Sequence, residues 1–310
     1  MVDKDLELEY VACNLCNSNS YELHLQREDL NLYLPGIFRL VKCKNCGLIY
    51  QNPRPSQNSW ETIYPDEYDQ YVNVNKGQHT LKLFIDNYGL FKRAKIISKY
   101  CKGGNLCDIG CSTGDFLITL QRFPQWNGYG VEPKKTMAEI ANARRLKVHH
   151  GYFDEKAFPD IEFDCVTLWN TIEHLSDPSD TLSLINRRLN KGGLLIFNTP
   201  NLDSFDARFF GKYWIGYELP RHFFVFSENT IDSLLQKSGF NIERTFCFYG
   251  QHAAAMSSLR FYLRAQSKGK LYSLENILFS IPVKALLLPI FYLQDKIKKS
   301  SQISIIAKKT

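Results

Sequence analysis

No apolar signal core opens this sequence of 310 residues, because residues 1–7 are acidic and polar. We therefore expect no secretion through such a signal and predict a cytoplasmic protein. The sequence also lacks a strong excess of one charge: its formal net charge is +6, much of it from scattered lysines and arginines. A nucleic-acid partner is therefore permitted but not indicated, and small anionic substrates are equally compatible.

No apolar run is long and unbroken enough to predict a membrane span. The candidate, residues 277–293, is interrupted by Pro282, Lys284 and Pro289. We expect residues 253–299 to be inserted helices that form a buried hairpin. Peripheral membrane contact through residues 277–299, aided by the lysines at its end, is the alternative.

Nine cysteines in a reducing compartment are better interpreted as metal ligands and buried thiols than as disulfides. Four of them form two CxxC pairs separated by 26 residues, and Gly47 after the second pair permits a tight turn. This spacing is typical of a closed structural zinc site. A redox pair needs only one CxxC, and neither pair lies beside a βαβ pattern. The predicted zinc ligands are Cys13, Cys16, Cys43 and Cys46.

A glycine turn at residues 106–116 organises the rest of the chain. A short apolar run ends in Asp-x-Gly-x-x-x-Gly, with Asp108, Gly110 and Gly114, and passes into a helical pattern. Glycines allow positive φ and close approach of the backbone to a ligand at the helix N-terminus. The pattern predicts a strand, a turn that cradles a nucleotide, and a helix.

Three other interpretations of this turn compete. Residues 110–114 fit the G-x-S-x-G elbow of α/β-hydrolases, but no HGGG-type sequence precedes them and this is the first strand of the core. The dehydrogenase pattern G-x-G-x-x-G fits poorly, because Ser112 and Asp115 stand where it needs glycines. A structural turn without a ligand is the third alternative.

Three further motifs follow in order. Residues 129–133 predict a strand that ends in Glu132, an acid that can accept hydrogen bonds from two ribose hydroxyls. Residues 173–178 read EH-x-x-D-P, and residues 192–201 read GG-x-L-x-x-x-T-P-N. With these motifs the chain resembles the class I S-adenosylmethionine-dependent methyltransferases over about residues 90–250.

The resemblance implies an α/β fold: a doubly wound, mostly parallel, seven-stranded Rossmann-like sheet that ends in an antiparallel strand. Ligands bind beyond the carboxyl ends of such strands. We expect a small zinc ribbon at residues 1–50, a connector and lead-in helix at 51–100, the S-adenosylmethionine-binding core at 101–250, and a helical insertion with the final strand at 251–310.

The resemblance also implies where S-adenosylmethionine binds. Glu132 is expected to hold the ribose, and Asp108 the turn and the methionine end. The family commonly carries an Asp beside the glycine after the third strand; here Tyr152, Phe153 and Asp154 follow it, so either Phe153 stacks on the adenine or Asp154 reaches its amino group. The expected cofactor-binding residues are Asp108, Gly110, Gly114, Glu132, Phe153, Asp154, Trp169 and Asn170.

The acceptor side is expected to come from two segments. Residues 205–226 form a long insertion after the fifth strand, and such insertions are usually functional. His222 and His174 are the candidate bases, although a lone histidine is more often structural, and Arg221 is the candidate grip for an anionic acceptor. Tyrosines and a tryptophan before the core either pack the ribbon or cover the pocket: Trp60, Tyr64, Tyr68 and Tyr71.

We expect methyl transfer to a small anionic metabolite. The order of ribbon and core, with CG-L-I-Y-x-N-P-x-P after the second cysteine pair, resembles bacterial sugar- and polysaccharide-pathway methyltransferases, whose typical acceptors are nucleotide-linked sugars. The first alternative is a ribosomal RNA base methyltransferase, which the modest charge and the lack of an N/D-P-P-Y/F sequence disfavour. The second is a non-catalytic scaffold, which the intact turn and Glu132 disfavour.

Overall fold

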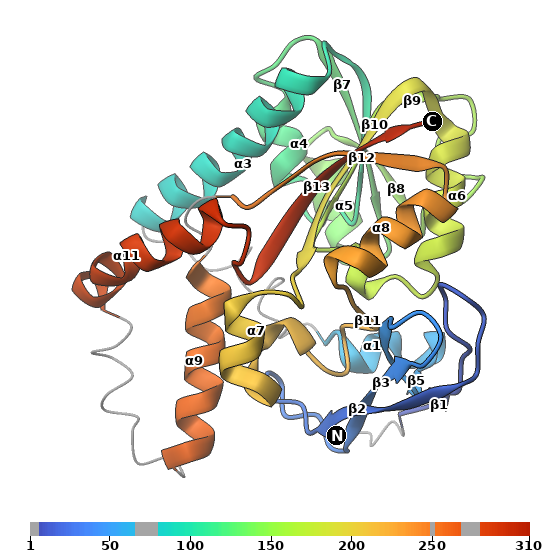
Figure 1. The fold of residues 1–310 in the computed structure, drawn as a ribbon. Helices are drawn as coiled ribbons and strands as arrows, with labels where there is room; N and C mark the ends of the chain where they lie inside the picture. The colour runs from blue at the N-terminus through green and yellow to red at the C-terminus, as the bar shows by residue number, and fades with distance from the viewer. Residues whose placement is uncertain (1–5, 66–79, 249–251, 268–279) are drawn as a thin grey trace.

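The core of the molecule is one seven-stranded sheet. The computed structural model describes residues 6–65, 80–248, 252–267 and 280–310 (Figure 1). Within them the strand order is β12-β13-β10-β9-β6-β7-β8, and only β13 runs antiparallel to its neighbours β10 and β12. The predicted doubly wound, mostly parallel sheet is confirmed. Its strands are β6 (Gly104–Ile109), β7 (Trp126–Glu132), β8 (Lys147–His150), β9 (Phe163–Trp169), β10 (Leu189–Pro200), β12 (Phe240–Phe246) and β13 (Gln302–Lys309).

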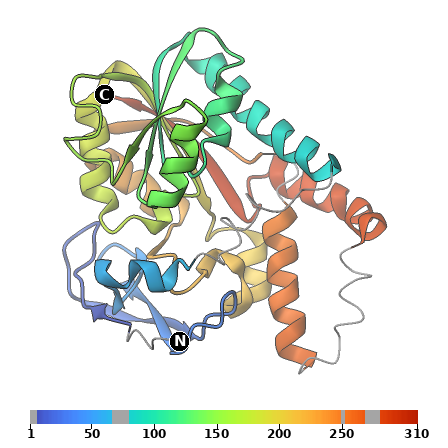
Figure 2. The same cartoon turned by 180° about the vertical axis from the view of Figure 1, so that it is seen from behind.

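Helices cover both faces of this sheet (Figures 1 and 2). Helices α3 (Thr80–Tyr100) and α4 (Asp115–Leu120) share a buried apolar cluster on one face, and α6 (Pro178–Arg188) and α8 (Glu228–Lys237) share another. Helix α5 (Lys135–Ala143) packs beside β7 and β8. Helix α8 begins with an N-cap, since Ser227 Oγ accepts a hydrogen bond from Thr230 N.

The N-terminal residues form a smaller sheet beneath the carboxyl ends of the parallel strands (Figure 1). Its order is β11-β4-β3-β2, so the ribbon expected from the sequence gains a strand, β11, from the segment after β10. Strand pairing between β11 and β4 therefore joins the ribbon to the core. The strands of this sheet are β2 (Tyr21–Arg27), β3 (Phe38–Cys43), β4 (Ile49–Gln51) and β11 (Phe224–Val225). The connector then forms β5 (Arg54–Pro55), η1 (Gln57–Ser59) and α1 (Trp60–Ile63). Strand β5 pairs with β1 (Leu8–Glu9).

The long insertion after β10 contains regular secondary structure. It folds into α7 (Phe205–Phe210), η3 (Gly211–Tyr213) and η4 (Ile215–Tyr217) before β11. The reason is its aromatic content: Trp214 is fully buried and packs edge-on against Tyr217 in a cluster with ribbon residues. Much of this segment is therefore core between ribbon and sheet.

Between β12 and β13, the described residues form helices α9 (His252–Ser267) and α11 (Ile281–Lys296). The expected buried hairpin is wrong for α11, because many of its described apolar side chains face solvent. Among the described residues, no helix is long and apolar enough to cross a membrane. Residues 277–279 of the predicted run lie outside the described part of the chain, as do Tyr68 and Tyr71.

Candidate functional site

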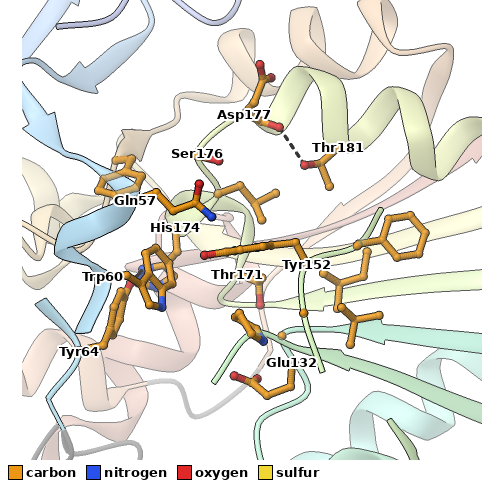
Figure 3. Close-up of a pocket in the computed structure, with 18 of the residues that line it drawn as sticks. Gln57, Trp60, Tyr64, Glu132, Tyr152, Thr171, His174, Ser176, Asp177 and Thr181 are labelled. Atoms are coloured by element: carbon orange, nitrogen blue, oxygen red, sulfur yellow. Dashed lines mark hydrogen bonds between the residues drawn. The ribbon is translucent and has the colours of Figure 1, made fainter. Parts of the chain in front are cut away.

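A cavity of about 530 Å³ lies at the carboxyl ends of β6, β7 and β9. That volume is within the usual range of small-molecule sites, and the edge of the sheet is where doubly wound folds bind ligands. Figure 3 shows Trp60 and Tyr64 on one side, Tyr152 reaching across, and Glu132 facing the same space. The cavity is therefore built by both the core and the connector.

The glycine turn borders this cavity. Gly110 has φ of 74°, and a Cβ there would lie 2.7 Å from Thr171 Oγ1. Gly114 has φ of 80°, and a Cβ there would lie 2.2 Å from Leu146 Cδ1. Both positions thus require glycine. Only Gly110 lines the cavity, whereas Gly114 lets α4 pack closely.

Glu132 lies at the end of β7 and lines the cavity, as predicted. Its Oε2 accepts from Ser112 N at 2.8 Å and its Oε1 from Lys134 N at 2.8 Å. Burial raises the pKa of Glu132, and these two backbone donors oppose that shift. A carboxylate has about four acceptor positions, so Glu132 can accept two further hydrogen bonds from a ligand.

Asp108 lies behind the turn and does not line the cavity. Its Oδ1 accepts from Thr167 Oγ1 at 2.7 Å on the neighbouring strand β9. Burial raises its pKa to about 7, although Thr167 and the nearby Arg93 guanidinium favour the carboxylate. Asp108 therefore supports the turn from within the sheet, and the expected contact with the methionine end is not seen in the cavity lining.

The loops after β8 and β9 contribute one predicted residue each. Phe153 lines the cavity, but Asp154 is exposed and accepts from Lys156 N at 2.9 Å and Ala157 N at 3.1 Å in a local turn. Asn170 also lines it, at φ of 54°. Trp169 points away, because side chains alternate along a strand.

Trp169 instead packs on the other side of the sheet. Its ring meets Phe116 edge-on at 5.6 Å, and the Arg93 guanidinium lies 4.7 Å from its centroid. The structure thus gathers Gly110, Glu132, Phe153 and Asn170 at the cavity, and it leaves Asp108, Gly114, Asp154 and Trp169 in supporting positions.

His174 lines the cavity together with Tyr64. Tyr64 Oη lies 2.7 Å from His174 Nδ1, and the Arg221 carbonyl oxygen lies 3.0 Å from the same nitrogen. A carbonyl can only accept, so we assign the proton to Nδ1, directed between that oxygen and Tyr64 Oη. Burial, with a smaller contribution from His222, lowers the pKa of His174 to about 3, so the ring is neutral.

The other two expected catalytic residues do not reach the cavity. Arg221 is fully buried: its Nη2 lies 2.6 Å from Asp29 Oδ1, and its Nε lies 3.1 Å from Glu218 Oε1. His222 donates from Nδ1 to Gly216 O at 2.8 Å, and burial lowers its pKa. Neither lines the cavity. Arg221 as an anion grip and His222 as the base are therefore corrected: Arg221 holds the segment after β10 against the ribbon, and His222 bonds within that segment.

Sequence reasoning missed Arg54, the only lysine or arginine among the described residues that line the cavity. Its Nε donates to Glu9 Oε1 at 2.8 Å, its Nη1 donates to Ser176 O at 2.6 Å, and its guanidinium lies 5.4 Å from the centroid of Phe223. The motif N-P-R-P carried the signal, but it reads as a connector unless the ribbon is placed against the core.

The four predicted zinc ligands lie together, with their sulfur atoms within 4.8 Å of one another. Cys13 Sγ is 3.4 Å from Cys46 Sγ, and Cys16 Sγ is 3.5 Å from Cys43 Sγ. Backbone N–H groups of Leu15 and Cys16 point at the Cys13 sulfur, as in a knuckle around a thiolate. Tetrahedral zinc with bonds of about 2.3 Å separates its sulfurs by about 3.8 Å, so the group fits this metal.

A second close group is formed by Glu173, His174 and His222. Burial raises the pKa of Glu173 to about 8, and burial keeps both imidazoles neutral. The Nδ1 atoms of the two histidines lie beside the carbonyl oxygens of Arg221 and Gly216, whereas Glu173 Oε2 has no hydrogen-bond partner among the described residues.

A family model described as a methyltransferase domain matches residues 88–245, just over half of the chain. A probable S-adenosylmethionine-dependent methyltransferase of Mycolicibacterium smegmatis is 26% identical over 194 residues, which are 59% of this chain and 70% of that protein. A demethylmenaquinone methyltransferase of Staphylococcus aureus is 30% identical over 102 residues, 31% of this chain and 42% of that protein. The family match thus covers the glycine turn and Glu132 but not the cysteine cluster.

Among solved structures, an S-adenosylmethionine-dependent methyltransferase of Thermotoga maritima, described as a possible histamine N-methyltransferase, superposes with a TM-score of 0.51. It is 21% identical, and the alignment covers 80% of this chain and 99% of that one. This likeness shows the fold. The chain covers more than two thirds of the mycobacterial relative, but less than two thirds of the length of the next curated relatives that it matches.

Proposed function

The chain belongs to the S-adenosylmethionine-dependent methyltransferases, and on that premise we propose that it methylates a small metabolite, a nucleotide-linked sugar or related polysaccharide precursor. Four contributions support this: the cofactor contacts, the aromatic wall, the cation Arg54, and the Tyr64–His174 pair. The last of these carries the proposal.

The cofactor fits the core side of the cavity. Glu132 has acceptor positions for the ribose hydroxyls, Phe153 offers an aromatic surface for the adenine, and Gly110 allows close approach of the backbone. When bound, S-adenosylmethionine supplies an activated methyl group, transferred by in-line displacement. The protein's main task is then to align the acceptor atom.

The connector side of the cavity suits a sugar. Trp60, Tyr152 and Phe223 line it with aromatic surface, on which the apolar face of a sugar ring can pack. Arg54 keeps further guanidinium donors beyond its hydrogen bonds to Glu9 and Ser176, and a guanidinium binds phosphate well. Arg54 thus takes the role expected of Arg221.

Tyr64 is the polar group that this wall directs at the acceptor. The 2.7 Å contact to His174 fixes its hydroxyl at the cavity surface. Because burial keeps His174 neutral, the pair orients a hydroxyl or amine by hydrogen bonding and adds no second cation beside Arg54 that would repel the sulfonium. We therefore assign Tyr64 to contact the acceptor and His174 to position Tyr64.

The test begins with a panel of nucleotide sugars and, separately, ribosomal RNA, each assayed for transfer of labelled methyl. With an accepted sugar, Tyr64→Phe should lower kcat/KM roughly tenfold, the cost of one positioning hydrogen bond, with Tm and cofactor affinity nearly unchanged. Tyr152→Phe is the matched control, since its hydroxyl interacts with Gln57 and not with a histidine. Methylation of RNA and of no sugar would replace the acceptor class, and full activity of Tyr64→Phe would remove Tyr64 from the site.

A further inference from the structure

A second hollow, of about 730 Å³, lies between α3, the edge strand β12 and α11. It shares no lining residue with the cofactor cavity. Its acid, Asp295, is buried and accepts from Ser300. Six cations line it from three elements: Lys92, Lys95 and Lys99 on α3, Arg244 on β12, and Lys296 and Lys298 at the end of α11. We call this the basic groove.

The helix that forms one wall of the basic groove also exposes apolar side chains. Leu286 is 77% exposed, Ile290 55%, Leu293 59% and Ile297 47%. Their spacing of four, three and four residues places them in one stripe along the helix. Figures 1 and 2 show α11 extending from the body on the same side as α3. We call these four residues the α11 stripe.

We propose that the basic groove and the α11 stripe together bind the surface of an anionic lipid membrane. Lipid phosphates would meet the lysines, and the stripe would enter the interfacial layer. This pairing of an apolar helix face with flanking cations is what membrane-surface helices use. Lys296 can remain at headgroup level, since its Nζ lies 5.2 Å from the centroid of Tyr292, beside the stripe.

Two other occupants fit less well. The phosphates of a nucleic acid would bind the six cations, but they would gain nothing from the exposed leucine and isoleucine side chains of the α11 stripe. A second copy packed symmetrically on the α11 stripe would bring two basic grooves toward each other, and like charges oppose that arrangement. An anionic membrane satisfies both features at once.

The first experiment measures co-sedimentation of the full chain with vesicles of phosphatidylcholine alone or mixed with phosphatidylglycerol. The wild type should bind the mixed vesicles, and added salt should weaken binding. The triple variant Lys92→Gln/Lys95→Gln/Lys99→Gln should lose on the order of 100-fold in partition coefficient, about fivefold per cation. A control removes three exposed lysines elsewhere and should bind as wild type: Lys135→Gln, Lys156→Gln and Lys191→Gln.

The second variant tests the stripe. Leu286→Ser/Ile290→Ser/Leu293→Ser should lose at least tenfold in binding, because less apolar area enters the interface. These side chains are exposed, so the folded state should keep its Tm and cofactor affinity. The matched control replaces exposed apolar residues elsewhere and should bind normally: Leu23→Ser, Ile37→Ser and Phe209→Ser.

Several outcomes would overturn the proposal. The wild type could ignore anionic vesicles, or both triple variants could bind them as well as their controls do. Retention of RNA by the stripe variant, with loss in the lysine variant and no vesicle binding, would assign the groove to nucleic acid. Dimers in sedimentation velocity that only the stripe variant abolishes would assign α11 to self-association.

Discussion

Replacing Arg221 by methionine separates a structural role from an acceptor-binding one. Arg221 and Asp29 are both completely buried and form a two-pronged ion pair, with the second prong, Nη1 to Oδ2, at 3.0 Å. Asp29 belongs to the ribbon and Arg221 to the segment after β10. Arg221→Met fills a similar volume but leaves a buried carboxylate without its partner.

The expected cost follows from what Asp29 retains. Breaking one side of a buried ion pair typically costs about 3–5 kcal/mol. Asp29 keeps hydrogen bonds from the backbone N–H groups of Asn31, Leu32 and Leu34, at 2.9 to 3.4 Å, and Glu218 keeps the one from Asn31 Nδ2 at 3.0 Å. These donors reduce the penalty, so we expect about 3 kcal/mol, or a fall in Tm of roughly 5–10 °C.

The assay is a double-mutant cycle in free energy of unfolding. Asp29→Asn, Arg221→Met and the double variant are unfolded in denaturant, and cofactor affinity is measured by calorimetry on the folded samples. The double variant should be more stable than the sum of the single losses predicts. Affinity for S-adenosylmethionine should stay within about twofold of wild type, because neither residue lines the cavity.

The opposite pattern would refute this assignment. If Arg221→Met keeps the wild-type Tm while KM for the methyl acceptor rises, Arg221 grips the acceptor and its burial in the ion pair is not its working state. Arg54→Met provides the complementary control: it should raise the acceptor KM and change Tm little, because Arg54 bonds to the partly exposed Glu9 and to the Ser176 carbonyl oxygen.

Three further predictions concern the cofactor, the metal and pH. Glu132→Ala should weaken S-adenosylmethionine binding by about 1.5–3 kcal/mol in calorimetry, and unchanged affinity would reject the ribose contact. Purified protein should hold about one zinc, lost in Cys43→Ser and kept in Cys101→Ser, by metal analysis. Burial raises the pKa of Asp108 from 3.8 to about 7, so its contribution to stability is present at low pH and declines as pH rises through that window. Asp108→Asn should flatten this decline in unfolding curves measured across pH, and an unchanged slope would contradict it.

Patterns local in sequence predicted the strand, turn and helix around the glycine turn. The strand, glycine turn and acid of residues 106–132 each depend on a few neighbouring residues, and the parallel sheet then brings their ends to one edge. The final antiparallel strand follows instead from the family resemblance. The sequence did not show which of these residues face the cavity. Asp154 and Trp169, which do not line it, are direct neighbours in sequence of Phe153 and Asn170, which do.

The acceptor side could not be predicted in the same way. Nothing near Arg221 in sequence indicates an ion pair with a residue 192 positions earlier. The burial of His222 likewise depends on Trp214 and its neighbours folding into a core with the ribbon. Distant contacts thus decided the roles of these residues.

The packing of the ribbon against the core explains why a metal site outside the family match would matter for catalysis. The connector that carries Arg54, Trp60 and Tyr64 leaves directly from the ribbon, and β11 pairs with β4 of that ribbon. The cofactor contacts come instead from the parallel sheet, which does not depend on the ribbon for its strand pairing. If zinc holds the ribbon, its loss should loosen one wall of the cavity and leave the other in place. The chain would then bind S-adenosylmethionine yet align its acceptor poorly. The acceptor wall would depend on the metal, and the cofactor wall on the parallel sheet.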